Sequence, residues 1–216
     1  VASEALQCPT LLQNGFGGHR IEGIGDKHVP WIHNVRNTDV VTAIDDEDCM
    51  RLLRLFNEKE GHAYLSDSGV EKELVDKLDM IGISGICNIL SAVKTAKYFE
   101  FGSEDVLVTI ATDSAAMYGS RLEELKAERG AYTMQRAAGD HERCMLGAGP
   151  SYMKELNYQD RKAIHNLKYF TWVEQQGKDV DDLRRLWDDR HIWTELFSQP
   201  SRWDELITEF NERTGL

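Results

Sequence analysis

Residues 82–118 read GISGICNILSAVKTAKYFEFGSEDVLVTIATDSAAMY, and this stretch decides the fold. A glycine turn at Gly82–Gly85 is followed by small and apolar residues, which predicts a helix over residues 86–99 that is buried against a sheet. The β-branched run Asp105–Ala111 predicts a buried strand, and the residues after it predict a helix over 117–128. Helix, strand and helix in succession indicate an α/β fold with a largely parallel sheet.

The residues before this stretch continue the α/β pattern. Asp39–Ile44 (DVVTAI) predicts a buried strand. Asp45 or Asp46 can then cap a helix, whose apolar residues keep helical spacing until a stop signal at Gly61. The chain opens on a short strand-like segment, Val1–Ser3, without a methionine. We therefore expect a processed or truncated polypeptide, or part of a longer chain.

The character of the sequence changes after Gly130. From Ser151 onward it is charged, rich in tryptophan and patterned for helices, with helices predicted over residues 181–187, 192–197 and 203–210. We expect two parts, residues 1–130 as an α/β part and residues 131–216 as a helical extension. The aromatic content of the extension suits a buried contact, so it is expected to cover an active site or to form an oligomer interface.

Composition excludes several classes of protein. The 37 acidic against 25 basic residues give a net charge of −12 and a pI of about 5.0, which argues against a nucleic-acid partner. No apolar run approaches the roughly 20 residues that span a bilayer, and no signal peptide is present, so no membrane association is expected. The widely spaced Cys8, Cys49, Cys87 and Cys144 fit neither a zinc site nor a disulfide framework, which indicates a reduced, cytoplasmic setting.

Glycine-rich loops at residues 14–18 (NGFGG) and 23–25 (GIG) could hold a phosphate through backbone N–H groups. Their spacing is not G-x-G-x-x-G, so an NAD(P)-binding oxidoreductase remains only an alternative hypothesis. A loop with a purely structural role is a commoner explanation of such glycines than either ligand.

Two further segments each allow two interpretations. Gly82–Gly85 places a hydroxyl and free N–H groups at a helix start, which suits an anion or a simple serine cap. Thr112–Ser114 follows the predicted strand at the sheet edge where α/β proteins bind ligands, or it simply caps the next helix. The seven histidines show no HExxH spacing, no metal site is expected, and no G-x-S-x-G motif supports a hydrolase.

Taken in order, four segments resemble motifs of the cysteine synthase and cystathionine β-synthase group of pyridoxal-phosphate (PLP) enzymes. The group includes threonine synthase and has the tryptophan synthase β-like fold. Residues 19–25 (HRIEGIG) resemble its H-K-I-Q-G-I-G, and residues 40–46 (VVTAIDD) resemble "evvtVsDeeA". Residues 82–85 are similar to G-I-S-S-G, and residues 106–118 are similar to its strand ending in P-D-S-G-E-R-Y. The resemblance implies that this chain is the C-terminal part of such a fold.

The same resemblance implies roles for individual residues. Ser114 would hydrogen-bond the pyridine nitrogen of pyridoxal 5'-phosphate, and a neutral hydroxyl partner would leave that nitrogen unprotonated. Such a ring suits β-elimination and β-replacement. Ser84 and Gly85 would lie near the edge of the cofactor ring. The residues implied on the substrate side are Gly23, Ile24 and Gly25.

The chain also departs from the family pattern. The family's Schiff-base lysine, its asparagine loop and its phosphate-binding G-T-G-G-T-type loop all belong upstream of these motifs, so we assign no catalytic residue in this chain. Thr112 replaces a proline, and residues 115–117 (AAM) replace Gly-Glu-Arg. These differences indicate a side branch with its own substrate.

The expected function is therefore one part of a PLP-dependent lyase or synthase acting by β-elimination or β-replacement on an amino acid. The expected partners are the amino-acid substrate, the N-terminal part of the enzyme in the same or a companion chain, and further copies of the chain in a homo-oligomer. The alternative is a non-catalytic fragment or subunit that retains the fold for partner binding.

Overall fold

A computed structural model describes residues 1–215, and the chain divides by its contacts into two compact units. Unit 1 consists of residues 1–27 and 39–156. Unit 2 consists of residues 28–38 and the chain from Asn157 onward. The predicted division into residues 1–130 and 131–216 is based on resemblance to a family, whereas these two units are defined by contacts between residues. The predicted boundary therefore stays a prediction.

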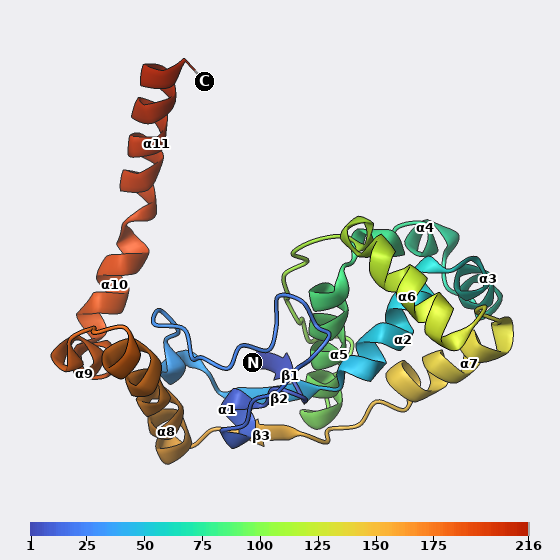
Figure 1. Cartoon of the computed structure of the whole chain (residues 1–216), viewed down its shortest axis with the longest axis horizontal. Helices are drawn as coiled ribbons and strands as arrows, with labels where there is room; N and C mark the ends of the chain where they lie inside the picture. The colour runs from blue at the N-terminus through green and yellow to red at the C-terminus, as the bar shows by residue number, and fades with distance from the viewer. Residues whose placement is uncertain (216) are drawn as a thin grey trace. The chain divides into compact units, whose positions relative to one another are not determined.

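Unit 1 is built on a three-stranded sheet with the order β1-β2-β3 (Figure 1). The strands are β1 (Ala2–Ala5), β2 (Val40–Ile44) and β3 (Met153–Glu155). β1 and β2 run parallel, whereas β3 pairs antiparallel with β2. The strands expected near residues 1–3 and 39–44 are therefore confirmed, but the sheet is mixed rather than largely parallel. The short β3, far along the chain, supplies the antiparallel pairing.

Two helices that pack against each other form much of the core of unit 1, and one of them also contacts the sheet. The central β2 is buried along its whole length. α2 (Asp46–Asn57) begins where the Asp45 carboxylate accepts a hydrogen bond from the Glu47 amide, as its sequence predicts. α5 (Ile83–Tyr98) lies beside α2 and against β2, and its small apolar residues face inward (Figure 1). The helix predicted over 86–99 is thus confirmed, with its start three residues earlier.

The remaining helices of unit 1 are short, and several of them pack around α2. A π-helical turn over Glu142–Leu146 follows the last of them, and 3-10 turns occupy Leu78–Met80 and Ala115–Tyr118. The helices are α1 (Thr10–Gln13), α3 (Lys59–Asp67), α4 (Lys72–Val75), α6 (Gly119–Arg129) and α7 (Met134–His141).

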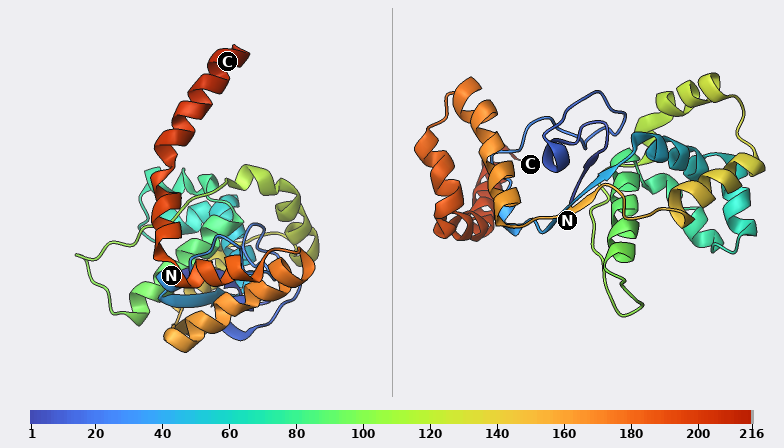
Figure 2. Two further views of the ribbon diagram at one scale, coloured as in Figure 1. Left: turned by 90° about the vertical axis from the view of Figure 1, so that its left-hand side faces the viewer. Right: turned by 90° about the horizontal axis from the view of Figure 1, so that it is seen from below.

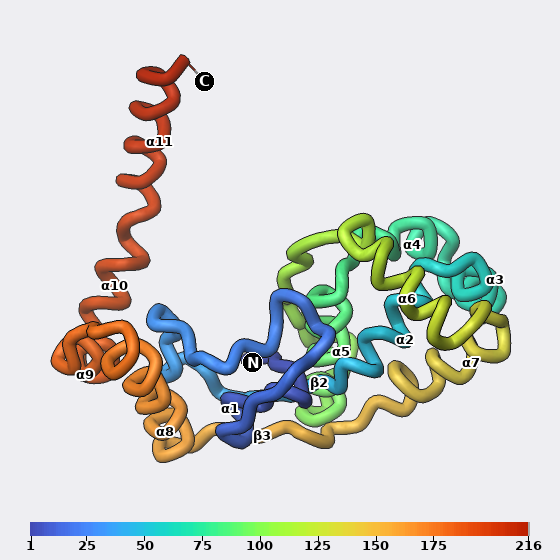
Figure 3. Tube along the Cα trace, viewed as in Figure 1, coloured from blue at the N-terminus to red at the C-terminus, as the bar shows by residue number. Residues whose placement is uncertain are grey.

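The strand predicted over Asp105–Ala111 is wrong. These residues form no strand, and Val106, Val108 and Ile110 are among the most exposed apolar residues of the chain. The trace returns beside α5 towards the start of α6 (Figure 3), tethered where the Asn88 amide donates to the Ile110 carbonyl at 3.1 Å. Residues 107–109 line a cavity of about 230 Å³ together with residues of β1 and α5. Because β1 is at the edge of the sheet and pairs only with β2, its other edge has no strand partner among residues 1–215.

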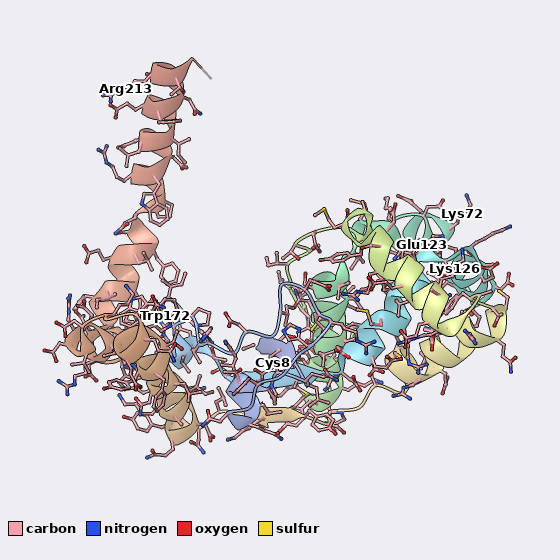
Figure 4. The ribbon with its side chains drawn as sticks, viewed as in Figure 1. Cys8, Lys72, Glu123, Lys126, Trp172 and Arg213 are labelled. Atoms are coloured by element: carbon pink, nitrogen blue, oxygen red, sulfur yellow. The ribbon has the colours of Figure 1, made fainter. Side chains whose placement is uncertain are left out.

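Unit 2 is helical and contains all five tryptophans of the chain. Trp172 (Figure 4) donates its indole N–H to the Val29 carbonyl at 2.8 Å. Its ring meets the Trp31 ring edge to face. A π-helical segment, Tyr169–Gln175, follows the first helix. The three helices predicted in the tail are confirmed. The helices are α8 (Tyr158–Lys168), α9 (Val180–Asp188), α10 (Arg190–Ser198) and α11 (Pro200–Thr214).

The four cysteines are free thiols, and each of them is buried in unit 1. The Cys87 thiol lies 3.4 Å from the Ser3 hydroxyl. Burial raises the pKa of the Cys144 thiol, and the nearby Asp48 carboxylate raises it further. A buried thiol that stays protonated is a poor nucleophile, so the Cys144 side chain fills the core rather than reacts.

Candidate functional site

Three segments that are distant in sequence meet at the start of α5. The Ser84 hydroxyl lies 2.6 Å from the Thr112 hydroxyl. Gly23 also lies against Ser84, because a Cβ added at Gly23 would be 3.7 Å from the Ser84 Cβ. The structure thus brings together Gly23, Ser84 and Thr112, one residue from each of three motifs that the sequence singles out.

The turn before α5 is held to residues 112–114 by close backbone packing. The Gly82 amide donates to the Asp113 carbonyl at 2.9 Å. A Cβ at Gly82 would lie 1.9 Å from Asp113 Oδ1, so only glycine fits there. Glycine at position 82 therefore allows the turn before α5 to pack closely against residues 112–114.

The Asp113 carboxylate is only half satisfied. Its Oδ2 accepts a hydrogen bond from the Tyr118 hydroxyl at 2.5 Å, and burial together with this carboxylate raises the pKa of Tyr118. Its Oδ1 is buried and has no hydrogen-bond partner among residues 1–215. A buried acceptor without a donor costs free energy, so this oxygen marks a place where a donor group could bind.

Ser114 directly follows this carboxylate. It is half-buried, and its carbonyl accepts a hydrogen bond from the Met117 amide in the turn that begins α6. Its hydroxyl makes no capping hydrogen bond to that turn. Ser114 is therefore the N-cap residue of that turn through its backbone alone, and a role of its hydroxyl towards a ligand stays a prediction.

The three residues implied on the substrate side line one cavity of about 500 Å³ in unit 1. Gly23 and Gly25 have φ of +85° and +96°, values that favour glycine. A Cβ at Gly25 would also lie 2.8 Å from His19 Nε2 and 3.0 Å from the Ala5 Cβ. The residues lining the cavity are Cys8, Phe16, Gly17, His19, Gly23, Ile24, Gly25, Asp26 and Lys27.

Sequence reasoning missed three side chains that give this cavity its chemistry: Phe16, His19 and Lys27. His19 Nδ1 is buried and has no hydrogen-bond partner within residues 1–215. His19 opens the segment whose glycines the sequence singles out, so its position within HRIEGIG is the signal that could have found it. Phe16 lies in the glycine-rich loop of residues 14–18, whereas Lys27 follows the HRIEGIG segment and belongs to no motif.

The other implied residues lie apart from this cavity. Gly85 is buried within α5, where a Cβ would lie 2.9 Å from the Ile81 side chain, which explains the glycine by packing alone. Neither Gly85 nor Ser114 lines the cavity of about 500 Å³. Their assignment to a cofactor stays a prediction.

The residues present fit part of a PLP molecule. Ser114 offers a hydroxyl that makes no capping hydrogen bond to the turn, and a hydroxyl of this kind could donate to a ring nitrogen. Two lysines of unit 1 are less suited to hold the cofactor. Lys94 is buried but donates to the Ala43 carbonyl at 2.9 Å, and Lys27 lines the cavity as an exposed side chain. In the described part of the chain, no cluster of His, Cys, Asp and Glu could hold a metal ion.

Comparison with known proteins finds a partial similarity to a cysteine synthase. The chain is 29% identical over 118 residues to cysteine synthase B of Campylobacter jejuni. The match covers 55% of this chain but only 32% of the relative, so the chain spans about a third of that protein's length. No family profile matches the chain, and no solved structure is significantly similar to it.

Proposed function

We propose that this chain is the C-terminal part of a PLP-dependent lyase or synthase that catalyses β-elimination or β-replacement on an amino acid. The observation that carries the proposal is the similarity to a cysteine synthase over 118 residues, a length that accommodates every motif between His19 and Tyr118. The meeting of Gly23, Ser84 and Thr112 at one helix start adds support. The Schiff-base lysine and the phosphate loop come from polypeptide outside residues 1–216, supplied by the same enzyme or by a companion chain.

When bound, PLP supplies an electron-accepting ring that stabilises charge at the substrate's α-carbon. The Ser114 hydroxyl holds the ring nitrogen without giving it a formal charge, which favours chemistry at the β-carbon. Gly23, Ile24 and Gly25 shape the substrate side, where the absence of side chains at the two glycines lets a small amino acid approach. His19, in the same cavity, is placed to orient a polar substrate group.

Replacing Ser114 tests its role directly. In the complete holoenzyme, Ser114→Asp is expected to shift the cofactor's absorption and to lower kcat about tenfold, or about 1.4 kcal/mol, because a carboxylate favours a protonated ring nitrogen. Ser114→Thr keeps the hydroxyl and serves as the matched control, with a spectrum close to wild type. An unchanged spectrum and rate in Ser114→Asp would remove Ser114 from the cofactor site.

Mapping the cofactor lysine tests the proposal as a whole. Native material is reduced with borohydride, digested and searched by mass spectrometry for a pyridoxyl-lysine peptide. We expect the label on polypeptide outside residues 1–216. A label on Lys27 would overturn the placement of the lysine outside this chain, and no label at all would favour the alternative.

That alternative is a non-catalytic subunit that keeps the fold for partner binding. The specific observation in its favour is the free edge of β1 beside unpaired residues 105–111, which suits association with another polypeptide. Failure to bind PLP when joined to the N-terminal part would favour it. For either function we propose a cytoplasmic location, supported by four buried, unpaired thiols.

A further inference from the structure

Unit 2 contains a cavity of about 330 Å³ that is lined by residues of α8, of the π-helical segment after it and of α9. The residues from each helix recur at helical spacing, so one face of α8 and one face of α9 enclose the cavity. The two helices are neighbours in unit 2 (Figure 2). The lining residues are Lys162, His165, Asn166, Tyr169, Phe170, Val180, Leu183 and Arg184.

Contacts between the two helices show that the start of α8 lies at the end of α9. The Tyr158 ring meets the Trp187 ring edge to face, and the Lys162 ammonium lies 4.4 Å from the centre of the same Trp187 ring. Further along α8, His165 Nε2 donates to the Leu183 carbonyl at 3.1 Å. Following α8 forwards therefore means following α9 backwards. Lys162 and Arg184 consequently lie towards one end of the cavity, which we call the cationic end.

The other end of the cavity is aromatic. Tyr169 and Phe170 lie where α8 passes into the π-helical segment, and they are 43% and 56% exposed. Val180, the first residue of α9, lines this end with them. π-Helical turns are rare and are frequent at functional sites. The turn here leaves two aromatic rings beside an open cavity, because no residue of the π-helical segment is buried.

The cationic end has no acidic side chain of its own. In the described part of the chain, no Asp or Glu lines the cavity, and Lys162 forms no ion pair, although Asp188 is nearby. Burial lowers the pKa of Lys162, so its surroundings disfavour an uncompensated charge. Arg184 pairs with Asp181 at 2.7 Å, but both side chains are exposed and the guanidinium has further N–H donors. An anion in the cavity would therefore find two cations able to bind it.

We propose that this cavity binds a small organic carboxylate with an apolar body, such as an arylalkanoic acid. The carboxylate lies between Lys162 and Arg184, and the body extends past Leu183 towards Tyr169 and Phe170. An uncharged apolar molecule would leave the cationic end unpaired, whereas a small inorganic anion would leave the aromatic end empty. The cavity volume is at the lower end of the range for small-molecule sites. The proposal uses no residue of the proposed catalytic function.

Binding of 3-phenylpropionate to the full chain tests the proposal. Titration is followed by calorimetry and by tryptophan fluorescence, since Trp187 lies beneath Lys162. We expect a dissociation constant of about 1 mM or below. Acetate lacks the apolar body and 3-phenylpropanol lacks the charge, so each should bind at least about tenfold more weakly. No binding of 3-phenylpropionate at about 10 mM, or equal binding of all three compounds, would overturn the proposal.

Removing one cation tests the position of the carboxylate. Lys162→Met keeps an apolar stem against Trp187 and should weaken 3-phenylpropionate about tenfold while leaving 3-phenylpropanol unchanged. Lys178→Met is the matched control, because Lys178 also lies over a tryptophan ring, that of Trp31, but does not line the cavity. Equal weakening by both variants would show that the net charge of the chain, and not the cavity, attracts the anion.

Removing one aromatic ring tests the position of the apolar body. Phe170→Ala should weaken 3-phenylpropionate and 3-phenylpropanol alike, by roughly threefold, because both lose the same ring contact. Phe197→Ala removes an exposed ring of the same unit that does not line the cavity, and it should change neither affinity. An unchanged affinity in Phe170→Ala would overturn the placement of the body at the aromatic end.

Discussion

Arg54→Ala is expected to lower the free energy of unfolding by about 3–5 kcal/mol, the largest effect of any change considered for unit 1. The Arg54 side chain is 2% exposed, and its guanidinium binds the Glu58 carboxylate at 2.7 Å and the Gly130 carbonyl at 3.0 Å. It also lies over the Tyr132 ring, 4.8 Å from the ring centre. Removing it leaves a cavity, an unpaired carboxylate and a carbonyl without its donor, all between α2 and the connection from α6 to α7.

Chemical denaturation of the purified chain, followed by far-UV circular dichroism, measures this effect. Lys77→Ala is the matched control, because Lys77 also pairs with a carboxylate four residues away but is 58% exposed, and it should change stability by less than about 0.5 kcal/mol. Arg54→Met with Glu58→Gln should recover most of the loss, since it removes both charges together. If Arg54→Ala cost no more than the control, the buried ion pair would contribute nothing to the packing of α2.

The stability of unit 2 is expected to rise with pH between about 8 and 10.5. Lys168 is fully buried, and its ammonium donates to the Trp31 carbonyl at 2.8 Å and to the His33 carbonyl at 2.6 Å. Burial lowers the pKa of Lys168 from 10.5 to about 8. Between these values the unfolded chain holds the proton and the folded chain does not, so raising the pH favours the folded form. The total gain is roughly 3 kcal/mol, at about 1.4 kcal/mol for each pH unit.

Tryptophan fluorescence during urea unfolding isolates this effect, because all five tryptophans lie in unit 2. The measured quantity is the difference between wild type and Lys168→Met, which cancels groups that titrate in both. Lys178→Met is the control, since the Lys178 ammonium only lies against the face of Trp31, 5.0 Å from the ring centre. Equal pH dependence in wild type and Lys168→Met would show that Lys168 keeps its proton throughout.

Local signals in the sequence were sufficient for much of unit 1. Five consecutive buried residues from Val40 to Ile44, followed by Asp45 as a cap, predict β2 and the start of α2 because both depend on neighbouring residues. The helices α9, α10 and α11 follow from apolar spacing in the same way. Strand pairing does not. Residues 105–111 carry every local feature of a strand, yet a strand also needs an adjacent edge, and no strand in the described part of the chain pairs with them. β3 has only three residues and pairs with β2 across more than a hundred residues of chain, so no local sequence pattern predicts it.

The candidate site likewise combines residues that sequence motifs predict with contacts that only the tertiary structure shows. Gly23 and Ser84 stand out in the sequence as members of motifs, but their contact depends on how three segments pack at the start of α5. The need for glycine at position 82 is visible only once Asp113 is found against it. Lys27 becomes a candidate only through the cavity that it lines, because it belongs to no sequence motif, whereas His19 also opens the HRIEGIG segment.

Residues 105–111, which pair with no strand and lie beside β1, are expected to make the chain prone to aggregation in the cell. Val106, Val108 and Ile110 expose one apolar run next to an open backbone edge, the combination from which intermolecular β-structure and insoluble deposits grow. Glu104 and Asp105 immediately precede the run and act as charged gatekeepers that slow such stacking. On its own, this chain should therefore tend to precipitate and to be retained by chaperones, whereas polypeptide that covers the edge should keep it in solution.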